Sequence, residues 1–170
     1  VDGREYIHEG FGFQPNFWRA PTDNDRYLRQ RWELLGWDNC GLLDARMECR
    51  SCAVTEQSAD RIVIATAFTF GSDAGRPTLR GTMEYRFAPD AGMELAFDAD
   101  ATFAESVLTL PRIGVQFAMP AGNEELCYFG CGPMETYRDK RQAGLVGIYA
   151  CKVSDHFEHY IRPQENMAHT

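Results

Sequence analysis

Two pairs of carboxylic acids are close enough in the sequence to share a site. Asp23 and Asp25 stand two positions apart, and Glu135 and Asp139 stand four apart. Acid and base catalysis across a glycosidic bond needs two carboxyl groups, about 5 Å apart when configuration is retained and farther apart when it is inverted. Asp in a turn more often caps a helix or closes the turn. Three uses therefore stay open for Asp23 and Asp25: capping, a polar contact at the rim of a sugar site, and direct catalysis.

The second pair stands in a segment rich in cations. Glu135 and Asp139 are surrounded by Arg138, Lys140 and Arg141, a composition typical of a solvated run of charges. No Ser or Cys has the turn context of an activated nucleophile, and no glycine-rich phosphate loop is present. We therefore predict no catalytic residue in this chain.

The segment from Asn16 to Asp25 has the composition of a positioning loop. It joins an aromatic anchor, one strong base, a stiffening proline and a cluster of oxygen-bearing side chains. The candidates for contacts at the rim of a binding site are Arg19, Asp23, Asn24 and Asp25.

Three aromatic residues are candidate platforms for a sugar ring. Trp18, Trp37 and Tyr137 could each stack on an apolar sugar face if they were exposed. Packing in a core or an interface is the commoner use of tryptophan, and we favour it for Trp18 and Trp37.

Cysteine and histidine offer only weak metal motifs. Cys49 and Cys52, with Cys127 and Cys131 far downstream, resemble a loose four-thiolate zinc pattern. Reduced, partly buried thiols that pack as small apolar groups are the favoured alternative. His156 and His159 could share a metal only on a helix, whereas their aromatic neighbours favour a half-buried loop or strand with the two rings on opposite faces. We predict no metal site.

Composition narrows the class of partner. The 170 residues are 44% hydrophobic, which suits a single globular domain with one core. A formal net charge of −8 disfavours nucleic acid and anionic membranes. No apolar run is long enough to span a bilayer, and no signal-peptide pattern is present, so a cytoplasmic location is expected. The sequence does not begin with Met, which indicates an internal piece of a longer protein.

Alternation of apolar and polar residues predicts a protein made mostly of strands. Four runs have the period of two that places one side of a strand on a core. A short turn joins two of them as an antiparallel hairpin. The runs are Arg61–Phe70, Gly81–Phe87, Met93–Asp98 and Ile113–Met119, with weaker strands at Asp44–Thr55 and Gly147–Val153. Such a pattern indicates an antiparallel sandwich.

One short helix is expected after the positioning loop. Asp23, Asn24 or Asp25 would be its N-cap. Leu28, Trp32 and Leu35 follow at helical spacing, and Gly36 suits a C-terminal cap. The run from Gly130 to Pro133 is typical of a tight turn.

Four sequence blocks together resemble the C-terminal, small-chain region of bacterial β-galactosidases of glycoside hydrolase family 2. They follow the family order over nearly the whole chain: Pro15–Asp25, Leu110–Gly114, Tyr128–Tyr137 and Tyr160–Asn166. The resemblance implies an all-β, antiparallel super-sandwich of the galactose mutarotase-like kind, with residues 1–170 as one domain truncated at both ends.

The resemblance also implies which chemistry lies elsewhere. In this family the catalytic glutamates and the ligands of magnesium belong to a separate barrel, and the Mg and Na implied for the complete enzyme have their ligands outside this chain. The expected partners are that barrel with the other domains, or a large subunit, and a galactoside such as lactose. The complete enzyme is expected to be a homo-oligomer, and the isolated chain is expected to be inactive. A sandwich module that binds sugar or has a structural role without hydrolase activity is the alternative.

Several positions depart from the family pattern. Arg26-Tyr27 stands where a variable residue followed by Gly begins a mobile loop, and a Tyr does not adopt positive φ as readily as Gly. Thr136, Arg138 and Met167 replace the usual Asn, Pro and Gly. These changes are expected to affect turn geometry more than chemistry.

Overall fold

The computed structural model describes residues 3–27, 41–72, 79–89, 92–103, 107 and 109–169. The chain divides into two compact units, which are described separately. The first comprises Val1–Phe13, Ala20–Arg29 and Gln116–Thr170, and the second comprises Gln14–Arg19 and Gln30–Val115. The expectation of one sandwich domain over the whole chain stays a prediction.

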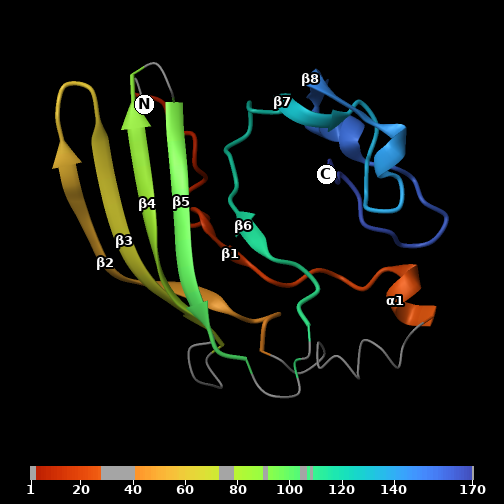
Figure 1. Cartoon of the computed structure of the whole chain (residues 1–170), viewed down its shortest axis with the longest axis horizontal. Helices are drawn as coiled ribbons and strands as arrows, with labels where there is room; N and C mark the ends of the chain where they lie inside the picture. The colour runs from red at the N-terminus through yellow and green to blue at the C-terminus, as the bar shows by residue number, and fades with distance from the viewer. Residues whose placement is uncertain are drawn as a thin grey trace. The chain divides into compact units, whose positions relative to one another are not determined.

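A four-stranded antiparallel meander forms most of the second unit (Figure 1). Consecutive strands are neighbours in the sheet, because each connection is short enough to return the chain antiparallel to the preceding strand. The strands are β2 (Arg46–Gln57), β3 (Ile62–Gly71), β4 (Leu79–Ala88) and β5 (Gly92–Ala101). The pairing of Ala88 with Gly92 confirms the predicted hairpin.

Four buried apolar residues of this sheet lie on one face, and Val63, which pairs with Arg86, is buried on the other. Register places Phe68 opposite Gly81, and Phe70 opposite Leu79, so alternate residues of β3 and β4 share that face. Phe68, Phe70, Leu79 and Met83 are at most 4% exposed and form the core of the unit. The period of two that predicted these strands therefore also identifies their buried side.

Gly81 permits a close approach on the buried face. The rings of Phe68 and Phe97 stack with centroids 5.7 Å apart, although β4 separates their strands. Gly81 lies beside Phe68 in the register and offers no side chain that would obstruct the pair. A Cβ at this position would collide with the backbone oxygen of Asp98 and would lie 2.8 Å from the Cβ of Ala99.

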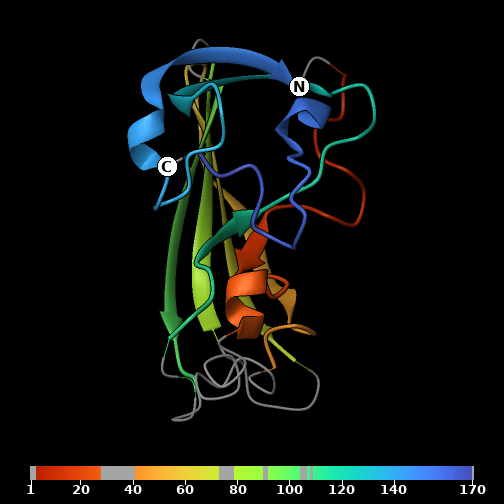
Figure 2. The same ribbon diagram turned by 90° about the vertical axis from the view of Figure 1, so that its right-hand side faces the viewer.

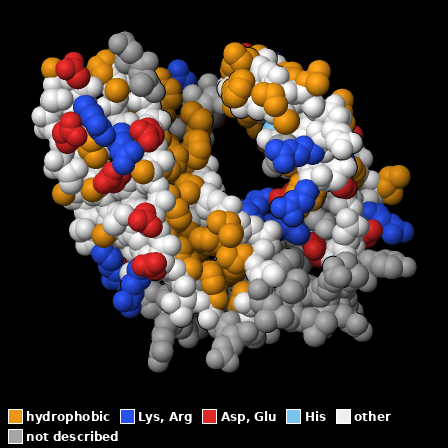
Figure 3. Space-filling model, viewed as in Figure 1, with side chains coloured by type: hydrophobic (Ala, Val, Ile, Leu, Met, Phe, Trp, Pro, Cys, Tyr) orange, Lys and Arg blue, Asp and Glu red, His pale blue; other side chains and the backbone are white. Residues whose placement is uncertain are grey.

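The other face of the sheet carries interleaved charges (Figure 3). Arg86 pairs with Glu84 on its own strand at 2.7 Å and with Glu94 across the hairpin at 3.0 Å. These hydrogen bonds raise the pKa of Arg86. Paired charges on the exposed face keep this side of the meander polar.

A smaller sheet joins β1 (Gln14–Asn16) to β6 (Gly114–Gln116). Phe17 follows β1 directly and is 5% exposed, packing against Phe70 and Phe103. This packing anchors the start of the positioning loop.

The first unit contains an antiparallel pair, β7 (Glu125–Gly132) and β8 (Leu145–Lys152), which Figures 1 and 2 show side by side. Two short 3-10 helices follow the strands, η1 (Arg141–Ala143) and η2 (Val153–His156). The unit also contains α1 (Asp23–Tyr27), the single α-helix of the part that the structure describes. None of the described helices is long and apolar enough to cross a membrane.

These elements confirm the predicted all-β, antiparallel fold class, and they correct some of its boundaries. The run predicted over Ile113–Met119 is a strand only at Gly114–Gln116, and Ile113, Phe117 and Met119 are exposed. The tight turn predicted at Gly130 is wrong, because β7 continues to Gly132 and the chain turns only after it, at a cis Gly132–Pro133 bond. Backbone pairing with β8 keeps these glycines extended. Leu28, Trp32, Leu35 and Gly36 of the expected helix lie outside the described residues.

Candidate functional site

The acidic loop begins with a helix cap. Asp25 Oδ2 accepts hydrogen bonds from the backbone N–H of Thr22 at 2.7 Å and from its hydroxyl at 2.9 Å. Thr22 directly precedes α1, so the bond from its backbone N–H to the Asp25 carboxylate is one half of a capping box, with Asp in place of the usual Glu. The sequence named Asp23, Asn24 or Asp25 as the N-cap, whereas the structure gives that position to Thr22.

Asp23 connects the loop to a distant motif. Its backbone N–H donates to the carbonyl of Pro163 at 2.6 Å. Its carboxylate pairs with Arg162 at 3.3 Å, and the Arg162 side chain is 69% exposed. An ion pair this exposed adds little stability, so the backbone bond is the firmer link.

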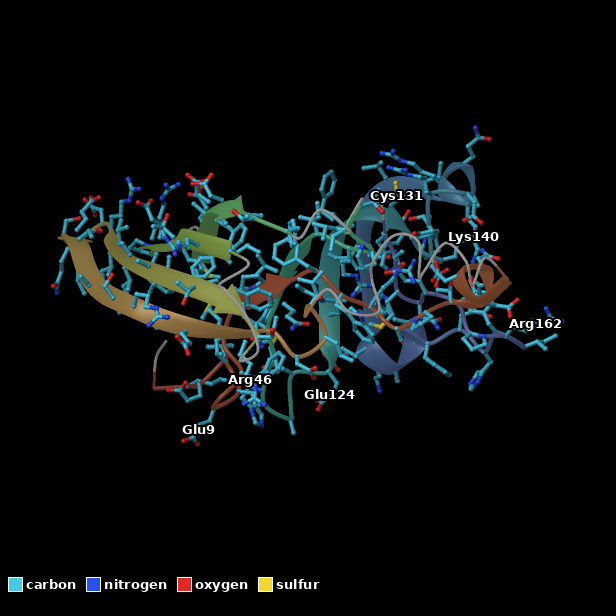
Figure 4. All side chains as sticks on the ribbon, turned by 90° about the horizontal axis from the view of Figure 1, so that it is seen from below. Glu9, Arg46, Glu124, Cys131, Lys140 and Arg162 are labelled. Atoms are coloured by element: carbon cyan, nitrogen blue, oxygen red, sulfur yellow. The ribbon has the colours of Figure 1, made fainter. Side chains whose placement is uncertain are left out.

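Glu135 lies in the middle of a polar network. Its Oε1 accepts hydrogen bonds from Lys140 at 2.9 Å and from the Tyr160 hydroxyl at 2.8 Å. Lys140 also donates to the Tyr160 hydroxyl, and its ammonium lies 4.6 Å from the ring centroid. Lys140 is labelled in Figure 4, as is Arg162, the partner of Asp23, which belongs to the same unit. The network joins the segment before β8 to the segment after it.

Protonation of this network follows from its contacts. Burial alone would raise the pKa of Glu135, but hydrogen bonds from Lys140 and Tyr160, the Lys140 charge and the Met167 N–H together hold it below its usual value. Hydrogen bonds to Tyr160 and Glu135 raise the pKa of Lys140 in turn. The pair is therefore ionised at neutral pH. A carboxylate that is 11% exposed and engaged in this way is not part of a solvated charge run, so that expectation for Glu135 is wrong.

The end of the described chain is fixed by backbone contacts. Met167 has a φ of 67°, and its N–H donates to Glu135 Oε2 at 3.2 Å. Thr136, fully buried, donates its N–H to Ala168 at 2.7 Å. The family pattern has Gly at the position of Met167, and the left-handed backbone here gives the physical reason for that preference.

The remaining predicted site residues are spread over both units. Asn24 is exposed on α1, and Tyr137 is 41% exposed. Trp18 and Arg19 are half-buried in the second unit, where the backbone N–H of Trp18 donates to Asn16 Oδ1 at 3.2 Å. Trp37 lies outside the described residues. The structure thus brings Asp23, Asn24 and Asp25 together on one helix.

No group of three or more His, Cys, Asp or Glu among the described residues could hold a metal ion. Cys49, Cys52 and Cys127 are exposed free cysteines, so the expectation of partial burial is wrong for these three. Cys49 and Cys52 lie on β2, an edge strand of the meander on which almost every residue is exposed, and Cys127 lies among the exposed residues at the start of β7. His156 is half-buried at the end of η2, and His159 is exposed.

Sequence reasoning missed the joint role of Glu135, Lys140 and Tyr160. Glu135 and Tyr160 are 25 positions apart, so no local sequence pattern connects them. The signal available was the resemblance itself, because Glu135 and Tyr160 both stand in quoted motif blocks. Two of the four blocks, those with Glu135 and Tyr160, lie in the first unit, and the block with Thr22 is divided between the two units.

The antiparallel sheets define an all-β protein. Residues of its motif blocks, such as Asp25 and Glu135, form hydrogen bonds that stabilise its loops. The family model described as beta galactosidase small chain matches residues 1–170. The chain therefore belongs to the beta-galactosidase small chain family, as its four motif blocks predicted.

Curated relatives are much longer than this chain. The beta-galactosidase of Lactobacillus delbrueckii subsp. bulgaricus is 36% identical over 163 residues, which is 96% of this chain and 15% of that protein. The beta-galactosidase of Actinobacillus pleuropneumoniae is 28% identical over 98% of this chain and 16% of its own length. That of Vibrio cholerae serotype O1 is 31% identical over 89% of this chain and 15% of its length. The chain thus spans about 15% of the length of these relatives.

Proposed function

We propose that this chain is the accessory C-terminal region of a retaining β-galactosidase that hydrolyses terminal β-D-galactosides such as lactose. The catalytic glutamates belong to a separate barrel, and this region shapes the rim of the sugar site. Its partners are the barrel and other domains, or a large subunit, of the same enzyme, which works as a cytoplasmic homo-oligomer. Family membership over the full chain is the observation that carries the proposal.

The state of the acidic residues supports an accessory role. Asp25 is engaged by Thr22, Asp23 by Arg162, and Glu135 by Lys140 and Tyr160. A general acid at neutral pH needs a raised pKa, whereas Glu135 has a lowered one. These three carboxylates are therefore better suited to stabilising loops than to transferring protons.

Asn24 is the member of the acidic loop best suited to contact a sugar. Its side chain is exposed, and within the described part of the chain no hydrogen bond engages it. An amide can both donate to and accept from sugar hydroxyls. The capped helix and the Pro163 bond hold its backbone in place.

The complete enzyme would use Mg and Na ions, with ligands outside this chain. Such ions would supply electrostatic stabilisation beside the reacting sugar. The residues of this chain would act by orienting the loop and by excluding water from its base.

A sugar-binding module without hydrolase activity is the second candidate. The exposed ring of Tyr137 favours it, because an exposed aromatic face can stack on a sugar. Titration of the chain with galactose or lactose, followed by tryptophan fluorescence, distinguishes the two: saturable binding to the chain alone favours the module.

The main test is an activity assay with a nitrophenyl β-galactoside. The isolated chain should give no turnover, and the parent polypeptide should be active. Turnover by the isolated chain that persists through rigorous purification would contradict the proposal.

A further inference from the structure

Cys151, His156 and His169 form a continuous hydrogen-bonded chain in the first unit. Cys151 Sγ lies 2.7 Å from His156 Nε2, and His156 Nδ1 lies 2.9 Å from His169 Nε2. His169 Nδ1 lies 2.9 Å from the backbone oxygen of Cys131, which Figure 4 labels on β7. Neither β-galactosidase membership nor the rim residues use this chain of groups.

The direction of each hydrogen bond in this chain is assigned from its last group, the backbone carbonyl of Cys131. His169 Nδ1 contacts the Cys131 carbonyl, which can only accept, at 2.9 Å and the Tyr128 hydroxyl at 3.2 Å, and we assign the proton to Nδ1 because the carbonyl contact is the shorter. In this tautomer His169 Nε2 accepts the hydrogen bond of His156 Nδ1–H. His156 Nε2 is therefore the free lone pair, and it accepts the hydrogen bond of the Cys151 thiol. In these tautomers the unprotonated Nε2 of His156 faces Cys151 Sγ and can act as its base.

Ring packing keeps the two imidazoles in these orientations. The rings of His156 and His169 meet edge to face, with centroids 4.9 Å apart. Tyr128 packs against both rings, with its centroid 4.5 Å from His169, and its hydroxyl lies 3.2 Å from His169 Nδ1. Burial, then Cys151 and Tyr149, raise the pKa of Tyr128, so its hydroxyl stays neutral at pH 7.

Cys151 also borders a cavity. Cys151 is half-buried, and a cavity of about 500 Å³ is bordered by Cys151, Glu125, Lys152 and Asp155, among others. This volume is in the range of small-molecule sites. Two carboxylates and one ammonium give the border a net negative charge, which favours neutral or cationic reagents over anionic ones.

We propose that Cys151 is a nucleophilic thiol that undergoes exchange with small uncharged disulfides, with His156 as its base and His169 as the residue that positions His156. As Sγ attacks one sulfur of the disulfide, His156 Nε2 takes the thiol proton. The S–S bond of the reagent breaks, and the leaving thiolate takes the proton back from His156. The products are a mixed disulfide on Cys151 and one free thiol, so no other oxidant is consumed.

The chain contains an internal control for this reaction. Cys127 lies on β7, next to the strand that carries Cys151, and it is more exposed. Within the described residues no histidine is hydrogen-bonded to Cys127, and it also borders the cavity. Exposure alone would therefore make Cys127 the faster thiol, whereas base assistance would make Cys151 the faster one.

The test treats the full-length protein at pH 7 with bis(2-hydroxyethyl) disulfide and follows each cysteine by peptide mass spectrometry. Cys151 should react about tenfold faster than Cys127, or more, as general-base assistance predicts. In urea the two rates should become equal. Equal rates in the native protein, or a faster Cys127, would overturn the proposal.

Three variants test the roles of the histidines. His156→Phe preserves ring packing and should lower the Cys151 rate to that of Cys127 or below it. His169→Gln retains an acceptor for His156 Nδ1 and should keep the rate within about twofold, while His169→Phe should lower it several-fold. If a variant unfolds, the reaction rate of Cys127 rises as well. In that case the comparison of the two His169 variants tests the proposal. An unchanged Cys151 rate in a folded His156→Phe protein, or equal rates in the two His169 variants, would contradict the mechanism.

Discussion

The carboxylate of Glu135 accepts a hydrogen bond from the backbone N–H of Met167, whose φ of 67° is positive. The same carboxylate binds Lys140 and Tyr160 through its other oxygen. One acidic side chain therefore stabilises two loops and a strained residue that lie far apart in the sequence.

Replacing Met167 by Gly should stabilise the protein by up to about 1 kcal/mol. A left-handed backbone costs an L-residue about 1–2 kcal/mol, and the greater freedom of Gly in the unfolded chain offsets part of the gain. Met167 is 46% exposed, so little packing is lost. Urea denaturation of both proteins measures the difference. Met134→Gly, at an exposed residue without positive φ, should be destabilising instead, and a similar loss at Met167 would contradict the argument.

Glu135→Gln should lower stability at pH 7 and weaken its dependence on acid. The folded-state pKa of Glu135 lies below its usual value of 4.5. Its contribution is therefore fully present above pH 4.5 and is lost as the pH falls through the folded-state value. Loss of hydrogen bonds to a charged group predicts a cost of about 1–3 kcal/mol at pH 7.

Melting temperatures between pH 3 and pH 7 check this prediction. Asp139→Asn, at an exposed neighbour, is the matched control and should change the profile little. A Glu135→Gln protein with the same acid slope as the unmodified chain would show that another group controls it.

Asn24 and Asp25 should separate binding from stability in the parent enzyme. Asn24→Ala should raise KM for a nitrophenyl β-galactoside about twofold to tenfold, the effect of one hydrogen bond, without changing the melting temperature. Asp25→Ala removes the acceptor of two Thr22 bonds and should cost about 0.5–2 kcal/mol of stability. Steady-state kinetics and thermal melts on both variants measure the effects on KM and on stability separately. An unchanged KM for Asn24→Ala would show that this residue does not contact the sugar.

Gly81→Val should destabilise the meander by about 1–3 kcal/mol, or more. The new Cβ would meet the backbone of Asp98 and would displace Phe68 from its stack with Phe97. Gly114→Ala is the control, because a Cβ there has no neighbour within 4 Å. Chemical denaturation should show a large loss for the first variant and little change for the second. Similar losses in both would place the effect in strand propensity rather than in packing.

Strand periodicity accounts for most of what could be predicted of the fold. Met83, Phe68 and Phe70 fall on the alternation that defines β3 and β4, because a strand places every second side chain on the core. The run from Ile113 to Met119 has the same alternation, yet it forms a strand of only three residues. Alternation shows that a segment can form a strand, whereas pairing needs a partner that local sequence does not reveal.

The candidate site was predictable only in part. Asp25 was expected to cap or to contact a ligand, and its two bonds to Thr22 are those of a cap. Glu135 gave the opposite result, since its charged neighbours indicated solvent and its long-range partners bury it. Neighbours in sequence describe composition, and burial depends on contacts between distant segments.

By itself the sequence determined the fold class, the hairpin over Ala88 and Gly92, and membership of the family, because these depend on local periodicity, turn residues and motif order. Only the tertiary structure decided that Glu135 meets Tyr160 and Met167, and that Cys151 meets His156 and His169. Those contacts form when separate strands and loops pack together. The physical reason is that a hydrogen bond or a proton transfer requires atoms about 3 Å apart, a distance that packing sets.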